Sequence, residues 1–280
     1  MASIVPPADE HLTTGWEPDL PADDTLLRQA VLVHASWSVE VARTAGKPWR
    51  SEPRWAAGRI GDRGALTNPV ILRQPLTEPA EVLAEVGAML PPSVPYFLVS
   101  PWPTPDLREY GLALLGYPPL MVRFPGPRTP AASITSTSSS TSASPSVEVR
   151  QVRDAAGLAV AERVLVEGYP MPDLEPLAPG DLLAPGILTE TTRMWVAFVD
   201  GAPAAVAASH RHAGVTLVEY VATLPAARGR GAGAAVTWAA TLEEPDHPAV
   251  LIASDDGRPI YDRMGFVPLM RWTAWLRPGG

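Results

Sequence analysis

The chain has 280 residues, 46% of them apolar. Its formal net charge of −8 argues against a nucleic-acid partner, because binding nucleic acid requires a basic surface. The absence of cysteine excludes disulfides, a cysteine nucleophile and thiolate metal sites. The sequence has no run of about 18 apolar residues and no signal-peptide pattern, so we expect a cytoplasmic protein with no membrane partner.

Residues 1–128 alternate between helical and strand patterns. In the segment 23–45, residues such as Val31, His34 and Ala42 stand near helical spacing, which predicts a helix with one buried face. Further patterns predict helices at 78–90 and 107–115, and strands at 70–76, 96–100 and 119–124. We therefore expect an N-terminal α/β domain.

Residues 129–146 are rich in serine and threonine and poor in large apolar side chains. Such a segment cannot bury enough surface to order itself, so it predicts a flexible linker between two domains. A tract for phosphorylation or glycosylation is the alternative.

Residues 147–280 predict a second α/β domain with a mixed sheet. The dipeptide Asp200-Gly201 is typical of a two-residue hairpin. In chain order the patterns favour a strand at 147–152, a helix at 154–168 and a proline-rich loop at 169–186. Three strands follow, at 194–199, 202–211 and 215–223. The last patterns favour a helix at 233–244, a strand at 249–254, a helix at 258–264 and a strand at 268–276.

The most informative segment is the turn between the strand at 215–223 and the next helix. Gly229, Gly231 and Gly233 leave its backbone N–H groups unshielded by side chains. A glycine turn that leads into a helix N-terminus is an anion site, because free N–H donors and the helix dipole point the same way. Arg228 and Arg230 add positive charge. The turn therefore predicts a site for a group such as pyrophosphate.

Two known phosphate-binding motifs fit this turn poorly. The phosphate loop of nucleoside triphosphatases needs Lys-Ser/Thr after its last glycine, where Ala234-Ala235 stands here. The dinucleotide fingerprint G-x-G-x-x-G/A matches at Gly229, Gly231 and Ala234, but only 47 residues (280 − 233) follow Gly233, too few for a run of βαβ units. A dinucleotide-binding oxidoreductase remains an alternative that NAD binding would reveal.

The turn resembles the acyl-CoA signature R/Q-x-x-G-x-G/A of the GNAT superfamily of N-acyltransferases, with Arg228, Gly231 and Gly233 at the signature positions. A second segment, residues 261–266 (Tyr-Asp-Arg-Met-Gly-Phe), is similar to the Y-x-x-x-G-F of that family and follows the next predicted strand, as it does there. The resemblance covers residues 147–280. It implies a GNAT fold, which is a mixed α/β sheet whose central strands splay apart.

The resemblance implies that acetyl-CoA is a co-substrate. The N–H groups of the turn would hold its pyrophosphate, and they belong to Arg228, Gly229, Arg230, Gly231, Ala232, Gly233 and Ala234. A side chain at Gly231 or Gly233 would block the phosphates. Arg228 either contacts phosphate directly or makes a structural ion pair.

The resemblance also implies that the pantetheine arm adds as a pseudo-strand along Val221, Ala222 and Thr223. A backbone N–H at Val221 or Ala222 would then stabilise the oxyanion, and loss of one such donor lowers a rate by about 10²–10³-fold. Tyr261 would protonate the leaving thiolate, although a packed structural tyrosine is the alternative.

Glu219 is our candidate for the base that deprotonates the amine. By strand alternation it shares a face with Val221 and Thr223. An ion-paired strand glutamate is the alternative. His210 and His212 share a strand face by the same rule; they could relay a proton through water, but we favour surface histidines. No third ligand stands at useful spacing, so we expect no metal site.

The expected activity is transfer of an acetyl group from acetyl-CoA to a primary amine, by direct attack in a ternary complex. The acceptor is a small molecule or a peptide. The loop at 169–186 carries Asp173, Glu175 and Asp181 and no basic residue, so it could form an acidic rim for a cationic amine or be an ordinary solvated loop. A CoA-binding sensor or regulatory module without turnover is the alternative function.

A short internal match links the two halves. Residues 115–121 (Leu-Gly-Tyr-Pro-Pro-Leu-Met) align with residues 264–270 (Met-Gly-Phe-Val-Pro-Leu-Met) at an offset of 149 (265 − 116). The match predicts that residues 1–128 form a smaller, degenerate GNAT-like unit. In this alignment Leu112 replaces Tyr261, and the glycine signature is missing, so we expect the first half to be catalytically silent.

Overall fold

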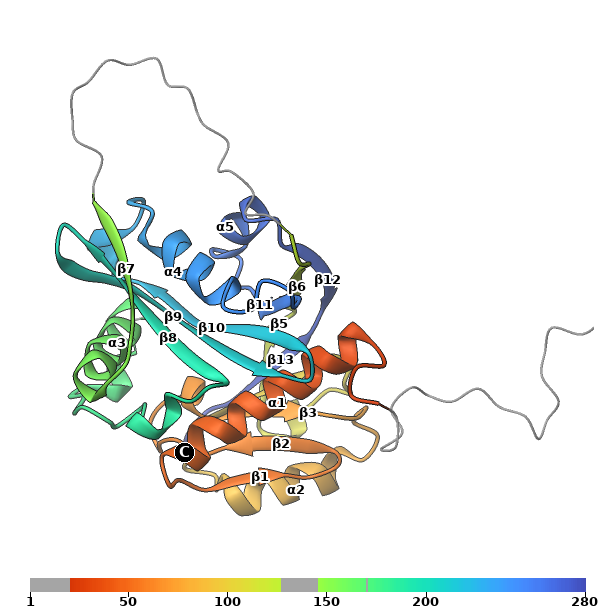
Figure 1. The fold of residues 1–280 in the computed structure, drawn as a ribbon. Coiled ribbons are helices and arrows are strands. Elements are labelled where there is room, and N and C mark those ends of the chain that lie inside the picture. Colours follow the sequence, from red (N-terminus) through yellow and green to blue (C-terminus); the bar gives the residue numbers. More distant parts are fainter. Residues whose placement is uncertain (1–20, 127–145, 170) are drawn as a thin grey trace, which may run out of the picture.

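The computed structural model describes residues 21–126, 146–169 and 171–280, and it contains two mixed sheets with helices packed on them (Figure 1). The first sheet has the order β1-β2-β3-β4-β13-β5, with bounds Trp49–Ser51, Trp55–Gly58, Pro69–Leu72, Tyr96–Ser100, Thr273–Arg277 and Ala113–Gly116. The second has the order β12-β6-β11-β10-β9-β8-β7, with bounds Val267–Arg271, Pro119–Arg123, Ala249–Ile252, Val215–Thr223, Ala202–His212, Thr192–Val199 and Val147–Gln151. The predicted linker, residues 129–146, lies outside the described residues except for Ser146.

Five α-helices accompany these sheets in the described part of the chain: α1 (Leu26–Thr44), α2 (Pro79–Met89), α3 (Ala155–Gly168), α4 (Ala232–Thr241) and α5 (Arg258–Arg263). Side chains cap two of them, because the hydroxyl of Thr25 accepts from the N–H of Arg28 at 3.1 Å and the carboxylate of Asp154 accepts from the N–H of Gly157 at 2.8 Å. The five helices confirm the predictions at 23–45, 78–90, 154–168, 233–244 and 258–264 to within a few residues.

The helix predicted over residues 107–115 is wrong. Only the 3₁₀ turn Arg108–Tyr110 is helical, and Gly111, with a φ of 77°, ends it. The chain then enters β5, which pairs with β13; the partner of Gly116 is Ala274, 158 residues later (274 − 116). Pairing over that distance overrides the local helical pattern. The hairpin of β1 and β2 was not predicted.

The two sheets exchange one strand each. β6, from the first half of the chain, lies between β11 and β12 of the second sheet, and β13, from the second half, lies between β4 and β5 of the first. Both inserted strands are antiparallel to their neighbours. Neither residues 21–126 nor residues 146–280 therefore contain all the strands of one sheet.

The sheets repeat one topology, but not at the predicted offset. Each sheet has an antiparallel pairing (β2 with β3, and β9 with β10) followed by a parallel pairing (β3 with β4, and β10 with β11). The inserted strand (β13 or β6) and an edge strand (β5 or β12) come next, and only β7 lacks a counterpart in the first sheet. By this order β5 corresponds to β12 and β6 corresponds to β13. The alignment of Gly116 with Gly265 is therefore wrong, because Gly116 ends β5 whereas Gly265 precedes β12. The unit that repeats the topology is the first sheet, which includes β13 from the second half of the chain, and not residues 1–128 alone.

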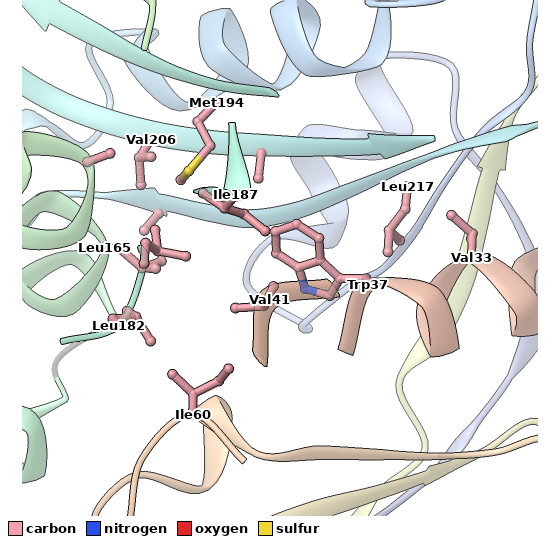
Figure 2. Close-up of a cluster of buried hydrophobic side chains, with 14 of the residues drawn as sticks. Val33, Trp37, Val41, Ile60, Leu165, Leu182, Ile187, Met194, Val206 and Leu217 are labelled. Atoms are coloured by element: carbon pink, nitrogen blue, oxygen red, sulfur yellow. The ribbon is translucent and has the colours of Figure 1, made fainter. Parts of the chain in front are cut away.

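One hydrophobic core joins the halves. Trp37 and Val41 of α1 pack with Leu165 of α3 and with Met194 and Leu217 of the second sheet (Figure 2). α1 also packs closely on the first sheet, since an added Cβ at Gly58 of β2 would lie 2.2 Å from the carbonyl oxygen of Ser38. Because α1 touches both sheets, it holds the first half against the face of β10. None of the helices among the described residues has the length and apolar character to cross a bilayer.

Candidate functional site

The two central strands of the second sheet separate toward one end, as the GNAT resemblance predicts. β10 and β11 are parallel and pair only at Thr216 with Ala249 and at Leu217 with Val250. β10 then continues to Thr223 beside β9. Within the described residues no strand pairs with the other edge of this stretch. An extended ligand can add to such an edge as a further strand.

A β-bulge interrupts β10 at this opening. The register of β10 with β9 shifts between Glu219 and Ala222, and Tyr220 has a φ of 53°, a value that non-glycine residues rarely adopt. The bulge breaks the alternation from which we predicted that Glu219 shares a face with Val221 and Thr223. That prediction is wrong, because Glu219 faces α1 whereas Val221 and Thr223 face α4.

The glycine turn leads from β10 into α4 through the 3₁₀ turn Pro225–Ala227. Gly229 and Gly231 have φ values of 76° and 85°, which favour glycine. An added Cβ at either position would meet no atom within 4 Å, so the outer side of the turn is open. Gly231 is the N-cap of α4, and the N–H groups of residues 232–234 belong to the first helical turn, where no helix carbonyl can accept from them. The turn thus offers the N–H groups of residues 232–234 at a helix N-terminus. The predicted donors at Arg228 and Arg230 are already used, because their N–H groups donate to the carbonyls of Pro225 and Ala227 at 3.3 Å.

Gly233 has a packing role, and its predicted clearance for phosphate remains a prediction. An added Cβ there would lie 2.6 Å from the hydroxyl oxygen of Thr223, closer than non-bonded atoms approach. Glycine at this position therefore allows α4 to pack directly against the end of β10.

The two arginines of the turn have partners within the protein. Arg228 donates to the carbonyl of Gly168 at 3.3 Å and to the carbonyl of Thr223 at 3.4 Å, so it ties the end of α3 to the turn. Arg230 forms an ion pair with Asp200 in the β8–β9 turn. Arg228 therefore has a structural role, made through backbone carbonyls rather than an ion pair, and its direct phosphate contact remains a prediction.

Glu219 lies in a largely desolvated environment that still opens to a ligand. Burial raises the pKa of its carboxyl to about 7, against the opposing effect of the Tyr220 N–H, which donates to Oε2 at 3.4 Å. The side chain keeps 27% of its surface exposed, and the Nε2 atom of His34 lies 3.9 Å from Oε1. A carboxylate with a pKa near 7 is matched to accepting a proton at neutral pH.

Three tyrosines lie within electrostatic reach of Glu219. Burial raises the pKa of Tyr261 to about 12 and also raises the pKa of Tyr220, and the charge of Glu219 adds to both rises. The pKa of Tyr169, whose side chain is 40% exposed, is raised by partial desolvation and by the same charge. Tyr261 is 8% exposed and packs edge to face on Phe266, with ring centres 5.9 Å apart. All three phenols are protonated at neutral pH and can donate hydrogen bonds. The predicted acid and the predicted base therefore lie within electrostatic reach of each other.

α1 contributes side chains that the sequence did not assign to this site. Trp37 packs edge to face on Tyr220 at 5.1 Å, and the buried ring of His34 lies 4.9 Å from Trp272, at the junction of β12 and β13. Helical spacing placed His34 on the buried face of α1, which was the one signal available. Its approach to Glu219 depends on packing between the halves, which no local pattern reveals.

The surface interpretation of the two histidines holds for His212, which is exposed, but is wrong for His210. The ring of His210 lies 2.8 Å from the hydroxyl of Ser36 on α1 and 2.7 Å from the hydroxyl of Thr192 on β8. Burial lowers its pKa to about 3. His210 is a neutral, hydrogen-bonded link between α1 and the second sheet. No group of three or more potential metal ligands occurs among the described residues.

The acidic loop after α3 is held in place by hydrogen bonds to α3 and to the first half of the chain. The buried carboxylate of Glu162 accepts from the N–H groups of Gly180, Leu182 and Leu183 at 2.7–3.0 Å. Arg63 of the first half donates to loop carbonyls at Leu174 and Glu175. The acidic side chains Asp173, Glu175 and Asp181 are exposed, which is compatible with both predicted interpretations, a rim and a solvated loop.

Comparison with known proteins shows which solved structures this architecture resembles. No protein-family model and no curated protein matches the sequence. A GCN5-related N-acetyltransferase from Kribbella flavida matches the structure with a TM-score of 0.60 at 25% identity, over 90% of this chain and 96% of its own. A putative GNAT-family acetyltransferase from Novosphingobium aromaticivorans has a TM-score of 0.53 at 16% identity, over 88% and 97%.

A functionally unknown conserved protein from Staphylococcus epidermidis also matches, with a TM-score of 0.52 at 15% identity, over 84% of this chain and 95% of its own. These matches extend over both halves, beyond the residues 147–280 on which the resemblance was based. The name of the Kribbella flavida protein supports an acyltransferase function in general, whereas the two less similar structures support the fold alone. Together with the splayed strands, the bulge and the glycine turn, they show that the chain has the GNAT acetyltransferase fold over most of its length.

Proposed function

We propose that the protein is an N-acetyltransferase that moves an acetyl group from acetyl-CoA to a primary amine by direct attack in a ternary complex. The observation that carries the proposal is the juxtaposition, at the open edge of β10, of the glycine turn, Glu219 and Tyr261. An anion site, a base and an acid at one opening are the parts that this reaction needs.

The glycine turn fits the pyrophosphate of CoA. Its outer side is open at Gly229 and Gly231, and the N–H groups of residues 232–234 point out of a helix N-terminus. The unpaired edge of β10 is an acceptor for the amide groups of the pantetheine arm, along Val221, Ala222 and Thr223. The bulge turns the backbone of this stretch, so that an N–H at Val221 or Ala222 can donate to the thioester oxygen.

Acetyl-CoA supplies the acetyl group as a thioester: the amine nitrogen forms a C–N bond to its carbonyl carbon, the C–S bond breaks, and CoA leaves as a thiolate. Glu219 accepts one proton from the ammonium form of the amine, which creates the nucleophile. Tyr261 donates its proton toward the sulfur and regains one from the nitrogen, which loses its second proton as the amide forms. A phenol with a pKa of about 12 is a weak acid, so we expect Tyr261 to contribute modestly.

The surroundings of Glu219 favour a cationic acceptor. Tyr169 and Tyr220 lie within electrostatic reach of the carboxylate, and aromatic faces attract ammonium groups. The exposed acidic side chains of the loop after α3 add negative charge outside the site. A small amine or a peptide amine meets these conditions.

Thermal unfolding in the presence of ligands tests the proposal. A ligand at about 100 times its dissociation constant adds about 2.7 kcal/mol of stability, which raises the melting temperature measurably. We expect acetyl-CoA and CoA to stabilise the protein and NAD and ATP to have no effect.

Gly231→Glu should abolish the response, and Gly87→Glu, which adds the same charge on α2 at a position with free space around it, should retain it. Stabilisation by NAD, or none by CoA, would overturn the assignment. Stabilisation by CoA without turnover of any amine would instead support the CoA-binding module.

A further inference from the structure

His34 and Glu219 come from opposite halves of the chain and meet in a buried part of the site. His34 is on α1, is 3% exposed, and directs Nε2 toward Oε1 of Glu219 at 3.9 Å. The approach exists because α1 packs against the face of β10 that carries Glu219. The proposed base therefore has a neighbour from the half that we expected to be catalytically silent.

The position of the proton on His34 follows from its other contact. The Nδ1 atom lies 2.7 Å from the carbonyl oxygen of Ala30. A carbonyl oxygen can only accept a hydrogen bond, so Nδ1 carries the proton and Nε2 of the neutral ring carries a lone pair. Among the described residues, Nε2 is buried without a hydrogen-bond partner.

A lone pair on Nε2 that faces an ionised carboxylate is unfavourable, and one proton between the two atoms removes the conflict. Burial lowers the pKa of His34 to about 4 and raises that of Glu219 to about 7. Both shifts assign the shared proton to the carboxyl, which then donates to Nε2. Such a bond needs the two atoms to approach by about 1 Å, to about 2.8 Å.

No other titratable neighbour takes this role. Tyr220 on β10, Tyr169 after α3 and Tyr261 on α5 are neutral donors, because the pKa of each phenol is raised above its ordinary value. His210 on β9 is neutral because burial lowers its pKa, and both of its ring nitrogens are already hydrogen-bonded. Within this cluster His34 is the group whose free lone pair faces Glu219.

We propose that His34 is a positioning residue for the base: its Nε2 accepts a hydrogen bond from the proton that Glu219 has taken from the substrate ammonium. The inference rests on the proposed function, since it assumes that Glu219 is the base. The N–H bond of the ammonium breaks, an O–H bond forms on Glu219, and that O–H is held by Nε2 while the amine attacks. The proton later leaves through the exposed side of Glu219. The first half of the chain thereby strengthens the base of the second.

Histidine ¹⁵N NMR of the full-length protein tests the pair without turnover. The chain has five histidines, so loss of one signal in His34→Gln identifies His34. We expect the Nδ1–H tautomer, with an Nε2 resonance that shifts as the pH passes about 7 and ceases to shift in Glu219→Gln. An Nε2–H tautomer, or an Nε2 resonance that is constant between about pH 5.5 and 9, would overturn the proposal.

The pH profile of kcat/KM separates a positioning role from a merely structural one. In His34→Gln the introduced side-chain amide can donate to the ionised carboxylate and so favours it; the acidic limb should therefore move to lower pH by about one unit, a tenfold change in the acid constant. His212→Gln makes the same exchange at an exposed site and should leave the limb unchanged. An unmoved limb in an active, folded His34→Gln enzyme rejects the inference but keeps the proposed function. Failure to bind CoA rejects the proposed function, while the NMR experiment still decides on the pair.

Discussion

Replacing Glu219 with glutamine should make the protein more stable and less active, and the gain in stability should depend on pH. The pKa of Glu219 is raised from its ordinary 4.5 to about 7 because the buried site disfavours the charged carboxylate. Below pH 4.5 the carboxyl is protonated in both the folded and the unfolded state, so ionisation adds no penalty. As the pH rises from 4.5 to 7 the unfolded state releases its proton first, and the free energy of unfolding falls.

The size of the effect follows from the raised pKa. At 1.36 kcal/mol per pKa unit, the ionised carboxylate destabilises the folded state by about 3 kcal/mol above pH 7. Glutamine has nearly the same shape and no charge. Glu219→Gln should therefore be more stable than the wild type by up to about 3 kcal/mol at pH 8.5, and by little at pH 4.5.

Urea denaturation of both proteins across this pH range measures the difference, and the histidines largely cancel because both chains contain them. Activity of the variant should fall by at least about tenfold at neutral pH, since the base is lost. A difference in stability that is flat with pH, or that grows toward acid, would refute the account of a carboxylate held near neutral pH by burial.

Three further outcomes are expected. Gly233→Ala should lower the free energy of unfolding by about 1–2 kcal/mol, because its Cβ would overlap Oγ1 of Thr223, and a Thr223→Ala background should remove the loss in urea denaturation. Tyr261→Phe keeps the contact with Phe266 but removes the hydroxyl, so kcat should fall by about tenfold while stabilisation by acetyl-CoA is unchanged; an unaltered kcat would make Tyr261 a packing residue. Removing residues 273–280 deletes β13 from the middle of the first sheet, so circular dichroism should show loss of cooperative unfolding in the first half of the chain, and an unaltered transition would contradict the strand exchange.

Features set by local chemistry were predictable from the sequence. Five of the six predicted helices are confirmed, and the glycine turn lies between β10 and α4, where the sequence predicted it. Tyr261 and Glu219, predicted from separate segments, lie within electrostatic reach of each other, and the roles assigned to them remain predictions.

Features set by distant contacts were not predictable. The bulge at Tyr220 reverses the faces of the residues that follow it, and simple alternation cannot anticipate an extra residue. The exchange of β6 and β13 pairs segments more than a hundred residues apart, and it led us to take β5 for part of a helix. His34 and His210 owe their contacts with Glu219 and with Ser36 to packing between α1 and the second sheet.

Release of CoA thiol in a mixture of the protein, acetyl-CoA and a panel of primary amines tests the central claim most directly. The chain contains no cysteine, so a thiol reagent detects the product with no signal from the protein itself. The account predicts thiol release that requires both a cationic amine and the intact protein, and that is lost in Gly231→Glu and reduced in Glu219→Gln. Thiol release that is equal in these variants, or absent with every amine in a protein that CoA does not stabilise, would contradict it.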